Sequence, residues 1–170
     1  MRTSYSQAHQ LRNAKTELYG GKLETPFECP SRAETILAAV NNSGLGPVEA
    51  PDSFGMEPVL AVHDADFIAF LENAWSDWQA AGYTGEAIAS IWPSRRMQTR
   101  IPRHIDGRLG YYALAAETSI SAGTWQAALA AKDVALTGAR QLLNGEHGVF
   151  SLCRPPGHHA ARDLVSYTHL

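Results

Sequence analysis

A long helical pattern followed at once by a short apolar run sets the class of fold open to this chain. Residues 124–145 read as a helix that stops at Gly145, and the run GVFSLC at 148–153 has the β propensity and apolar character of a buried strand. A buried strand directly after a long helix is typical of helices layered on a parallel sheet. We therefore expect an α/β fold, although helices outnumber strands.

The segment SRAETILAAVNNSG predicts a helix whose two ends are marked. Ser31 and Glu34 have the spacing of a capping box, in which each side chain bonds a free amide of the first turn. Gly44 ends the pattern. One apolar stripe runs along it, formed by Ala33, Ile36, Leu37 and Val40.

Other segments are predicted with less local information. Residues 63–82 repeat apolar side chains at helical spacing behind Asp64, a suitable N-cap. Residues 111–120 read as another helix, and residues 2–6 as a weak first strand. The polar stretch 9–30 is long for a loop, which favours a functional or interface role.

Composition excludes several classes of protein. The net charge is -3 over 170 residues, so no basic footprint for nucleic acid is expected, and the arginines at 95–108 read as a solvated loop or as structural ion pairs. Cys29 and Cys153 are too few for a disulfide framework. There is no secretory h-region and no apolar run of membrane-spanning length. We expect a cytoplasmic protein without membrane contact.

The loop RPPGHH follows the last predicted strand and carries two adjacent histidines. Pro155 and Pro156 fix the backbone, while Gly157 allows a close approach of the main chain. His158 and His159 can each take up and return a proton near neutral pH. Such a platform suits amide hydrolysis, where a base activates water and an acid protonates the leaving amine. A bare histidine pair alone would more often be structural.

The string SLCRPPGHHA resembles the histidine-pair loop of the histone deacetylase family. The segments LRNAKTELYGG, RAETILAAV, AWSDWQAAGYTGEAIA and GYYALAAETSISAGTWQAAL are similar, more narrowly, to the bacterial acetylpolyamine amidohydrolases. The resemblance implies part of an arginase/deacetylase-type parallel sheet flanked by helices, truncated after the His-His loop. Residues 1–164 would be the N-terminal part of one such domain, and residues 165–170 a non-native tail.

The resemblance also implies an activity, namely zinc-dependent removal of acetyl groups from N-acetylated polyamines. His159 would be the general base and then the acid, His158 would hold the same water, and Gly157 would line the substrate tunnel. The metal ligands and a tyrosine would lie downstream of the histidine pair, so no residue of this chain is assigned to Zn²⁺. Alternatives are deacetylation of acetyl-lysine in proteins and a non-catalytic binding module of the same fold.

Substrate and partner contacts are implied for five further residues. Glu17, Asp106 and Glu117 would supply the separated carboxylates that a polycationic substrate needs. Plain solvation is the alternative for Glu17 and Asp106, and an exposed helix position for Glu117. Tyr19 and Phe27 would lie in the N-terminal loop that pairs with a second subunit, giving a homodimer with a narrowed entrance. An ordinary buried aromatic is the alternative for Phe27.

Overall fold

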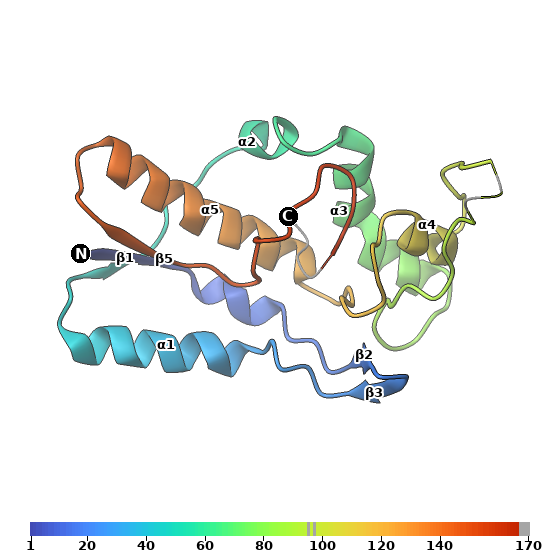
Figure 1. The fold of residues 1–170 in the computed structure, drawn as a ribbon, viewed down its shortest axis with the longest axis horizontal. Coiled ribbons are helices and arrows are strands. Elements are labelled where there is room, and N and C mark those ends of the chain that lie inside the picture. The colour runs from blue at the N-terminus through green and yellow to red at the C-terminus, as the bar shows by residue number, and fades with distance from the viewer. Residues whose placement is uncertain (95, 97, 167–170) are drawn as a thin grey trace.

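The computed structural model describes residues 1–94, 96 and 98–166 and contains a parallel sheet between helices. Figure 1 shows α5 and α1 on opposite sides of the strands β1 and β5. The elements in chain order are β1 (Arg2–Tyr5), the 3-10 helix η1 (Gln7–Leu11), β2 (Glu17–Tyr19), β3 (Lys22–Glu24), α1 (Pro30–Ser43), β4 (Val48–Glu49), α2 (Glu57–Leu60), α3 (Ala65–Ala80), α4 (Ile105–Tyr111), α5 (Thr124–Leu143) and β5 (Val149–Leu152).

The sheet has the order β4-β1-β5, and both pairings are parallel. Arg2 lies opposite Val149, so the first strand of the chain pairs with the last. Strands β2 and β3 form a separate antiparallel hairpin, which extends away from the sheet in Figure 1. The predicted α/β class, the first strand, the helix at 124–145 and the strand at 148–153 are therefore confirmed.

An aromatic core joins α3 to α4 and to the segment that follows it. Tyr112 stacks on Phe70 with ring centroids 4.7 Å apart, and Phe67 and Leu71 are buried in the same cluster. The Tyr112 hydroxyl donates to Asp66 Oδ2 at 3.0 Å. This core fixes the end of α4 and hence the course of residues 112–120.

The predicted helix at 111–120 is wrong. Only Tyr111 is helical there, as the last residue of α4. Ala113 forms a parallel bridge with Val165, and Ile120 forms an antiparallel bridge with Ala87. Backbone pairing with distant segments replaces the local helical hydrogen bonds, although the apolar spacing fits a helix.

The capping box at Ser31 and Glu34 is also wrong. The N-cap of α1 is Cys29, because Pro30 begins the helix two residues earlier than a cap at Ser31 requires, and no side chain caps the first turn. Ser31 Oγ instead contacts Cys29 Sγ, while Glu34 turns toward η1. Gly44 does end α1 with a φ of 63°.

Two other expectations concern surface segments. Asp64 is the N-cap of α3, but its carboxylate accepts from Arg162 at 2.6 Å rather than from the helix.

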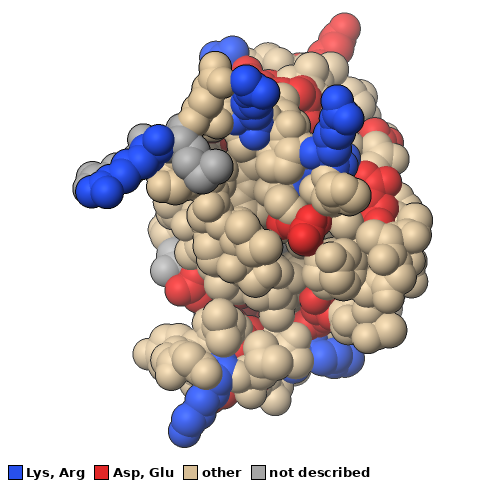
Figure 2. All heavy atoms as spheres, turned by 90° about the vertical axis from the view of Figure 1, so that its right-hand side faces the viewer, with Lys and Arg blue, Asp and Glu red and all other residues tan. Residues whose placement is uncertain are grey.

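Of the arginines at 95–108, Arg95 lies outside the described residues, whereas Arg108 pairs with Asp77 at 3.1 Å. In Figure 2 the Lys and Arg side chains stand apart around the rim of the hairpin-bearing face, with other residues between them. Among the described residues, no helix is both long and apolar enough to span a bilayer.

Candidate functional site

The histidine pair lies on a turn just beyond the carboxyl end of β5. The amide of Ala160 donates to Gly157 O at 3.2 Å, so His158 and His159 are the central residues of that turn. Their ring centroids are 4.1 Å apart with an interplanar angle of 68°. His159 Nδ1 lies 3.5 Å from Ser166 Oγ. Both histidines are exposed on the surface of the described chain.

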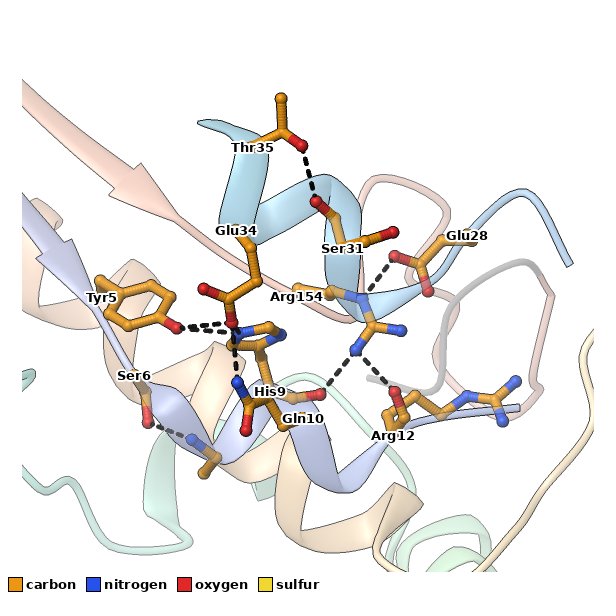
Figure 3. A network of polar contacts seen from close by, with 11 residues as sticks. Tyr5, Ser6, His9, Gln10, Arg12, Glu28, Ser31, Glu34, Thr35 and Arg154 are labelled. Carbon is orange, nitrogen blue, oxygen red and sulfur yellow. Dashed lines mark hydrogen bonds and ion pairs between the residues drawn. The ribbon is translucent and has the colours of Figure 1, made fainter. Parts of the chain in front are cut away.

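Arg154 anchors the start of this loop, as Figure 3 shows. Its side chain is 3% exposed, and Nη1 donates to the carbonyl oxygens of His9 and Arg12, each at 2.6 Å. Nε donates to Glu28 Oε1 at 2.9 Å. One planar guanidinium thus joins η1, the segment before α1 and the end of β5, a geometry that lysine cannot copy.

The ring of His9 fixes the same 3-10 helix from its other side. His9 is 2% exposed, and its Nε2 lies 2.9 Å from the Tyr5 hydroxyl and 3.0 Å from Glu34 Oε1. Gln10 Nε2 donates to the same carboxylate oxygen at 2.8 Å. The hydrogen bond from Gln10, followed by the contacts with His9 and Tyr5, lowers the pKa of Glu34. The network ties η1 to β1 and α1, so the carbonyl that receives Arg154 is held in place.

A cavity of about 370 Å³ opens beside the loop and brings three predicted residues together. Glu17, Glu117 and His158 all line it. Glu117 Oε2 is buried and accepts no hydrogen bond from the residues that the structure describes. An acceptor without a donor is costly to bury, so this oxygen is suited to a cationic or hydrogen-bonding ligand.

The cavity wall also carries arginines, which the sequence reasoning did not assign to the site. Arg154 is committed to Glu28 and the two carbonyls described above. Arg12 is buried and donates to the hydroxyls of Ser119 and Ser121 at 3.3 Å each, and desolvation lowers its pKa. Arg154 Nη2, like Glu117 Oε2, is buried without a hydrogen-bond partner among the described residues, and Arg32 also lines the cavity.

A second, more apolar cavity of about 480 Å³ lies on the other side of the loop. Gly157 lines this cavity and not the first one, together with residues of α2 and α5. Cys153 lines both, and burial raises the pKa of its thiol to about 11. The thiol is therefore protonated at neutral pH.

Neither of these two cavities is lined by His159, Asp106, Tyr19 or Phe27. Asp106 is in the first turn of α4, and its Oδ1 accepts from the amide of Gly107 at 2.7 Å. Tyr19 on β2 and Phe27 before α1 are 65% and 82% exposed. The substrate role of Asp106 and the interface role of both aromatics stay predictions.

The described residues do not by themselves form a zinc site. In residues 1–94, 96 and 98–166 no group of three or more His, Cys, Asp or Glu side chains is placed to hold a metal ion, whereas a catalytic zinc uses three protein ligands. Of the expected non-native tail, Val165 is buried in the core and Ser166 is described, while residues 167–170 lie outside the described part. The domain boundary at 164 stays a prediction.

Comparison with known proteins identifies the class of this fold and loop. Residues 26–166 match the model of the histone deacetylase domain, and the chain belongs to that family. It is similar to acetylpolyamine amidohydrolase from Mycoplana ramosa, with 57% identity over 164 residues, which cover 96% of this chain. It is also similar to acetylpolyamine amidohydrolase 2 from Pseudomonas aeruginosa, with 50% identity over 165 residues and 97% coverage of this chain.

A solved structure agrees with these relatives. The crystal structure of acetylpolyamine aminohydrolase from Burkholderia pseudomallei superposes with a TM-score of 0.91 at 30% identity, covering 100% of this chain and 49% of that one. The chain spans about half the length of the curated relatives, 48% in each of the two named above. The resemblance stated from the sequence and the arginase/deacetylase-type fold are thereby confirmed.

Proposed function

We propose that residues 1–170 supply the proton-transfer part of the active site of a zinc-dependent amidohydrolase that removes acetyl groups from acetylated polyamines. The observation that carries the proposal is the single cavity bordered by His158, Glu17 and Glu117. It places an imidazole and two carboxylates around one space, as hydrolysis of an amide on a cationic substrate requires. The relatives named above carry this activity in their names.

The proton transfers follow from the histidine turn. Neutral His159 takes a proton from water as the water oxygen bonds to the acetamide carbonyl carbon, and His158 orients that water. His159 then returns the proton to the nitrogen as the carbon–nitrogen bond breaks, which releases acetic acid and the amine; at neutral pH these products exist as acetate and the protonated amine. The zinc ligands expected for the family lie beyond the described residues, so these steps concern the histidines alone.

The carboxylates would bind the distal ammonium group of the substrate. Glu117 Oε2 has no donor among the described residues, so a bound ammonium would satisfy a buried acceptor. Asp106, placed outside the cavity, would reach substrate only from another subunit or after movement of α4. Gly157 lies on the opposite side of the loop and would shape the tunnel through its backbone.

The same proposal includes a homodimer through the N-terminal loop. Tyr19, Leu23 and Phe27 are exposed apolar side chains on or beside the β2–β3 hairpin. Exposed aromatic groups on a projecting hairpin suit a protein interface. A second subunit covering them would narrow the entrance to the cavity, admitting slim polyamines. No nucleic acid, no membrane and a cytoplasmic location remain part of the proposal.

Complementation tests the activity directly. The 170-residue chain is expressed alone and together with the half of the Mycoplana ramosa enzyme that the alignment leaves uncovered. Zinc per chain is measured by plasma spectrometry, and hydrolysis of acetylputrescine is compared with that of an acetyl-lysine peptide. We expect no turnover from the chain alone and turnover preferring acetylputrescine from the pair.

The other outcomes separate the competing functions. Turnover that prefers the peptide would make the protein an acetyl-lysine deacetylase. A pair that assembles and binds zinc but hydrolyses neither substrate would contradict an enzymatic role for this loop. One zinc with turnover from the chain alone would contradict the assignment of the metal ligands to a region outside it.

A further inference from the structure

Glu86 lies between the two segments that carry the cavity carboxylates. Its Oε1 accepts from the amide of Lys15 at 2.9 Å, and its Oε2 accepts from the amide of Thr16 at 2.8 Å and from the Thr16 hydroxyl at 2.7 Å. Both carboxylate oxygens are therefore used on the chain immediately before Glu17. Charge-assisted hydrogen bonds of this kind are short and strong, so they fix the backbone at the start of β2.

The other side of Glu86 is tied to the segment that carries Glu117. Ala87 and Ile120 exchange backbone hydrogen bonds of 2.8 Å and 2.9 Å. Ser119 Oγ donates to Glu86 Oε2 at 3.4 Å. Glu86 is thus attached to Ile120 through its neighbour Ala87, and its side chain contacts both Ser119 and residues 15–16.

A buried arginine strengthens the same link. Arg12 donates to the hydroxyls of Ser119 and Ser121, and the charge of Glu86 favours the protonated guanidinium. The two segments are joined at Glu86 and at Arg12, with opposite charges side by side. The separation of Glu17 from Glu117 is therefore fixed in part by Glu86, which does not line the cavity, and in part by Arg12, which does.

We propose that Glu86 is a positioning residue that sets the distance between the Glu17 and Glu117 carboxylates, and with it the length of acetylated amine that the cavity prefers. The proposal deepens the function proposed above and rests on it for the identity of the ligand. Glu86 touches backbone amides and hydroxyls rather than the substrate. Its effect should therefore depend on whether the ligand carries a charge at its far end.

The first experiment tests, without any ligand, whether Glu86 links residues 15–16 to residues 119–120. Amide hydrogen exchange and ¹⁵N chemical shifts are compared for the wild-type chain, Glu86→Gln and Glu72→Gln, the last being an exposed position on α3. Glutamine keeps the size of glutamate but turns a donor toward one of the amides. We expect exchange of the Lys15 and Thr16 amides to rise about tenfold or more, as loss of a charged hydrogen bond predicts, and resonances of both residues 17 and 117 to move.

The second experiment measures ligand specificity. Three probes are titrated into the labelled chain, and a Kd is determined for each. The probes are N-acetylputrescine, the longer N-acetylcadaverine and the neutral N-butylacetamide. In Glu86→Gln the ratio of the Kd values for the two acetylated diamines should change, and the Kd of the neutral amide should stay the same. Glu86→Asp keeps the charge and should retain part of the wild-type ratio, while Glu72→Gln should retain all of it.

The remaining results would overturn either the positioning role of Glu86 or the proposed ligand. Unchanged exchange at residues 15 and 16, or an unmoved Glu117 resonance, would overturn the positioning role whatever the probes do. Equal weakening of all three probes would overturn it as well, because Glu86 would then act only on stability. If the wild-type chain binds none of the acetylated diamines, the ligand assigned above is wrong for this chain, and the exchange data alone decide whether Glu86 links the two segments.

Discussion

Arg154 Nη1 donates to the carbonyl oxygen of His9 at 2.6 Å, across 145 positions of sequence. The contact joins the base of the histidine turn to the 3-10 helix near the start of the chain. His9 is in turn locked by Tyr5 and Glu34. The start of the loop that carries His158 and His159 is therefore held by residues that lie far from it in sequence.

Replacing Arg154 by Lys tests this dependence. A single ammonium nitrogen cannot serve two carbonyls and a carboxylate at once, so buried acceptors lose their donors and we expect a loss of about 3 kcal/mol of unfolding free energy. Urea denaturation measures it. The control is Arg162→Lys, at a 77% exposed ion pair with Asp64, where the loss should stay below about 1 kcal/mol. Equal losses in the two variants would contradict the anchoring role.

The histidine turn can be tested in the complemented enzyme. His159→Ala should lower kcat by about 100- to 10,000-fold, the usual worth of a positioned acid–base group, and should leave the zinc content unchanged. His147→Ala, at an exposed position before β5, is the matched control and should retain activity. Loss of zinc from a folded His159→Ala protein would show that His159 is a ligand instead.

The core tyrosine predicts an alkaline transition. Burial, and after it the hydrogen bond to Asp66, raises the pKa of Tyr112 to about 12. The folded state keeps the proton where the unfolded state, with a pKa near 10, has lost it. The stability from this group is thus fully present below pH 10 and is lost as the pH rises to about 12.

Two measurements check that transition. Phenolate absorbance should show one tyrosine ionising near the upper end of this window, and Tyr112→Phe should remove that step. The urea midpoint of the wild type should fall more steeply across the window than that of Tyr112→Phe. Parallel pH profiles for the two proteins would mean that the Tyr112 hydroxyl does not contribute.

Self-association tests the exposed hairpin. Phe27→Asp should raise the dimer dissociation constant at least about tenfold, equivalent to about 1.4 kcal/mol, because it places a charge in an apolar contact. Sedimentation equilibrium measures the change. Leu143→Asp alters a side chain that is 88% exposed at the end of α5 and should leave the constant unchanged. A larger effect from Leu143 would move the interface away from the N-terminal loop.

Segments whose structure depends on local spacing were predicted well from the sequence. The helix α5 and the strand β5 follow from a continuous apolar pattern and a β-prone run, and the end of α1 follows from Gly44. Residues 111–120 were wrongly predicted as a helix, because bridges to Ala87 and Val165 decide their conformation and no local pattern records such partners. The same reason explains Glu34, whose partners lie on β1 and η1 rather than in its own helix.

Some residues of the candidate site could likewise be proposed from the sequence, and others could not. Glu17, Glu117 and His158 could be proposed together from a family resemblance, and the cavity does bring them together. Arg154 was visible only as the first letter of the loop motif, and Glu86 only as one letter of a segment that resembles the family. Their partners are 126 or more positions and up to 71 positions away, respectively, so their roles become visible only once the chain is folded.

The pairing of Arg2 with Val149 has a consequence during protein synthesis. The central strand β1 is made first, but β5, which completes one of its edges, is made only after about 145 further residues. At about 5 to 20 residues per second the ribosome needs roughly 8 to 30 s to reach β5. Throughout that interval β1 has an open edge that can pair with another nascent chain. Early binding of a chaperone to the first residues should therefore raise the yield of this protein more than faster elongation would.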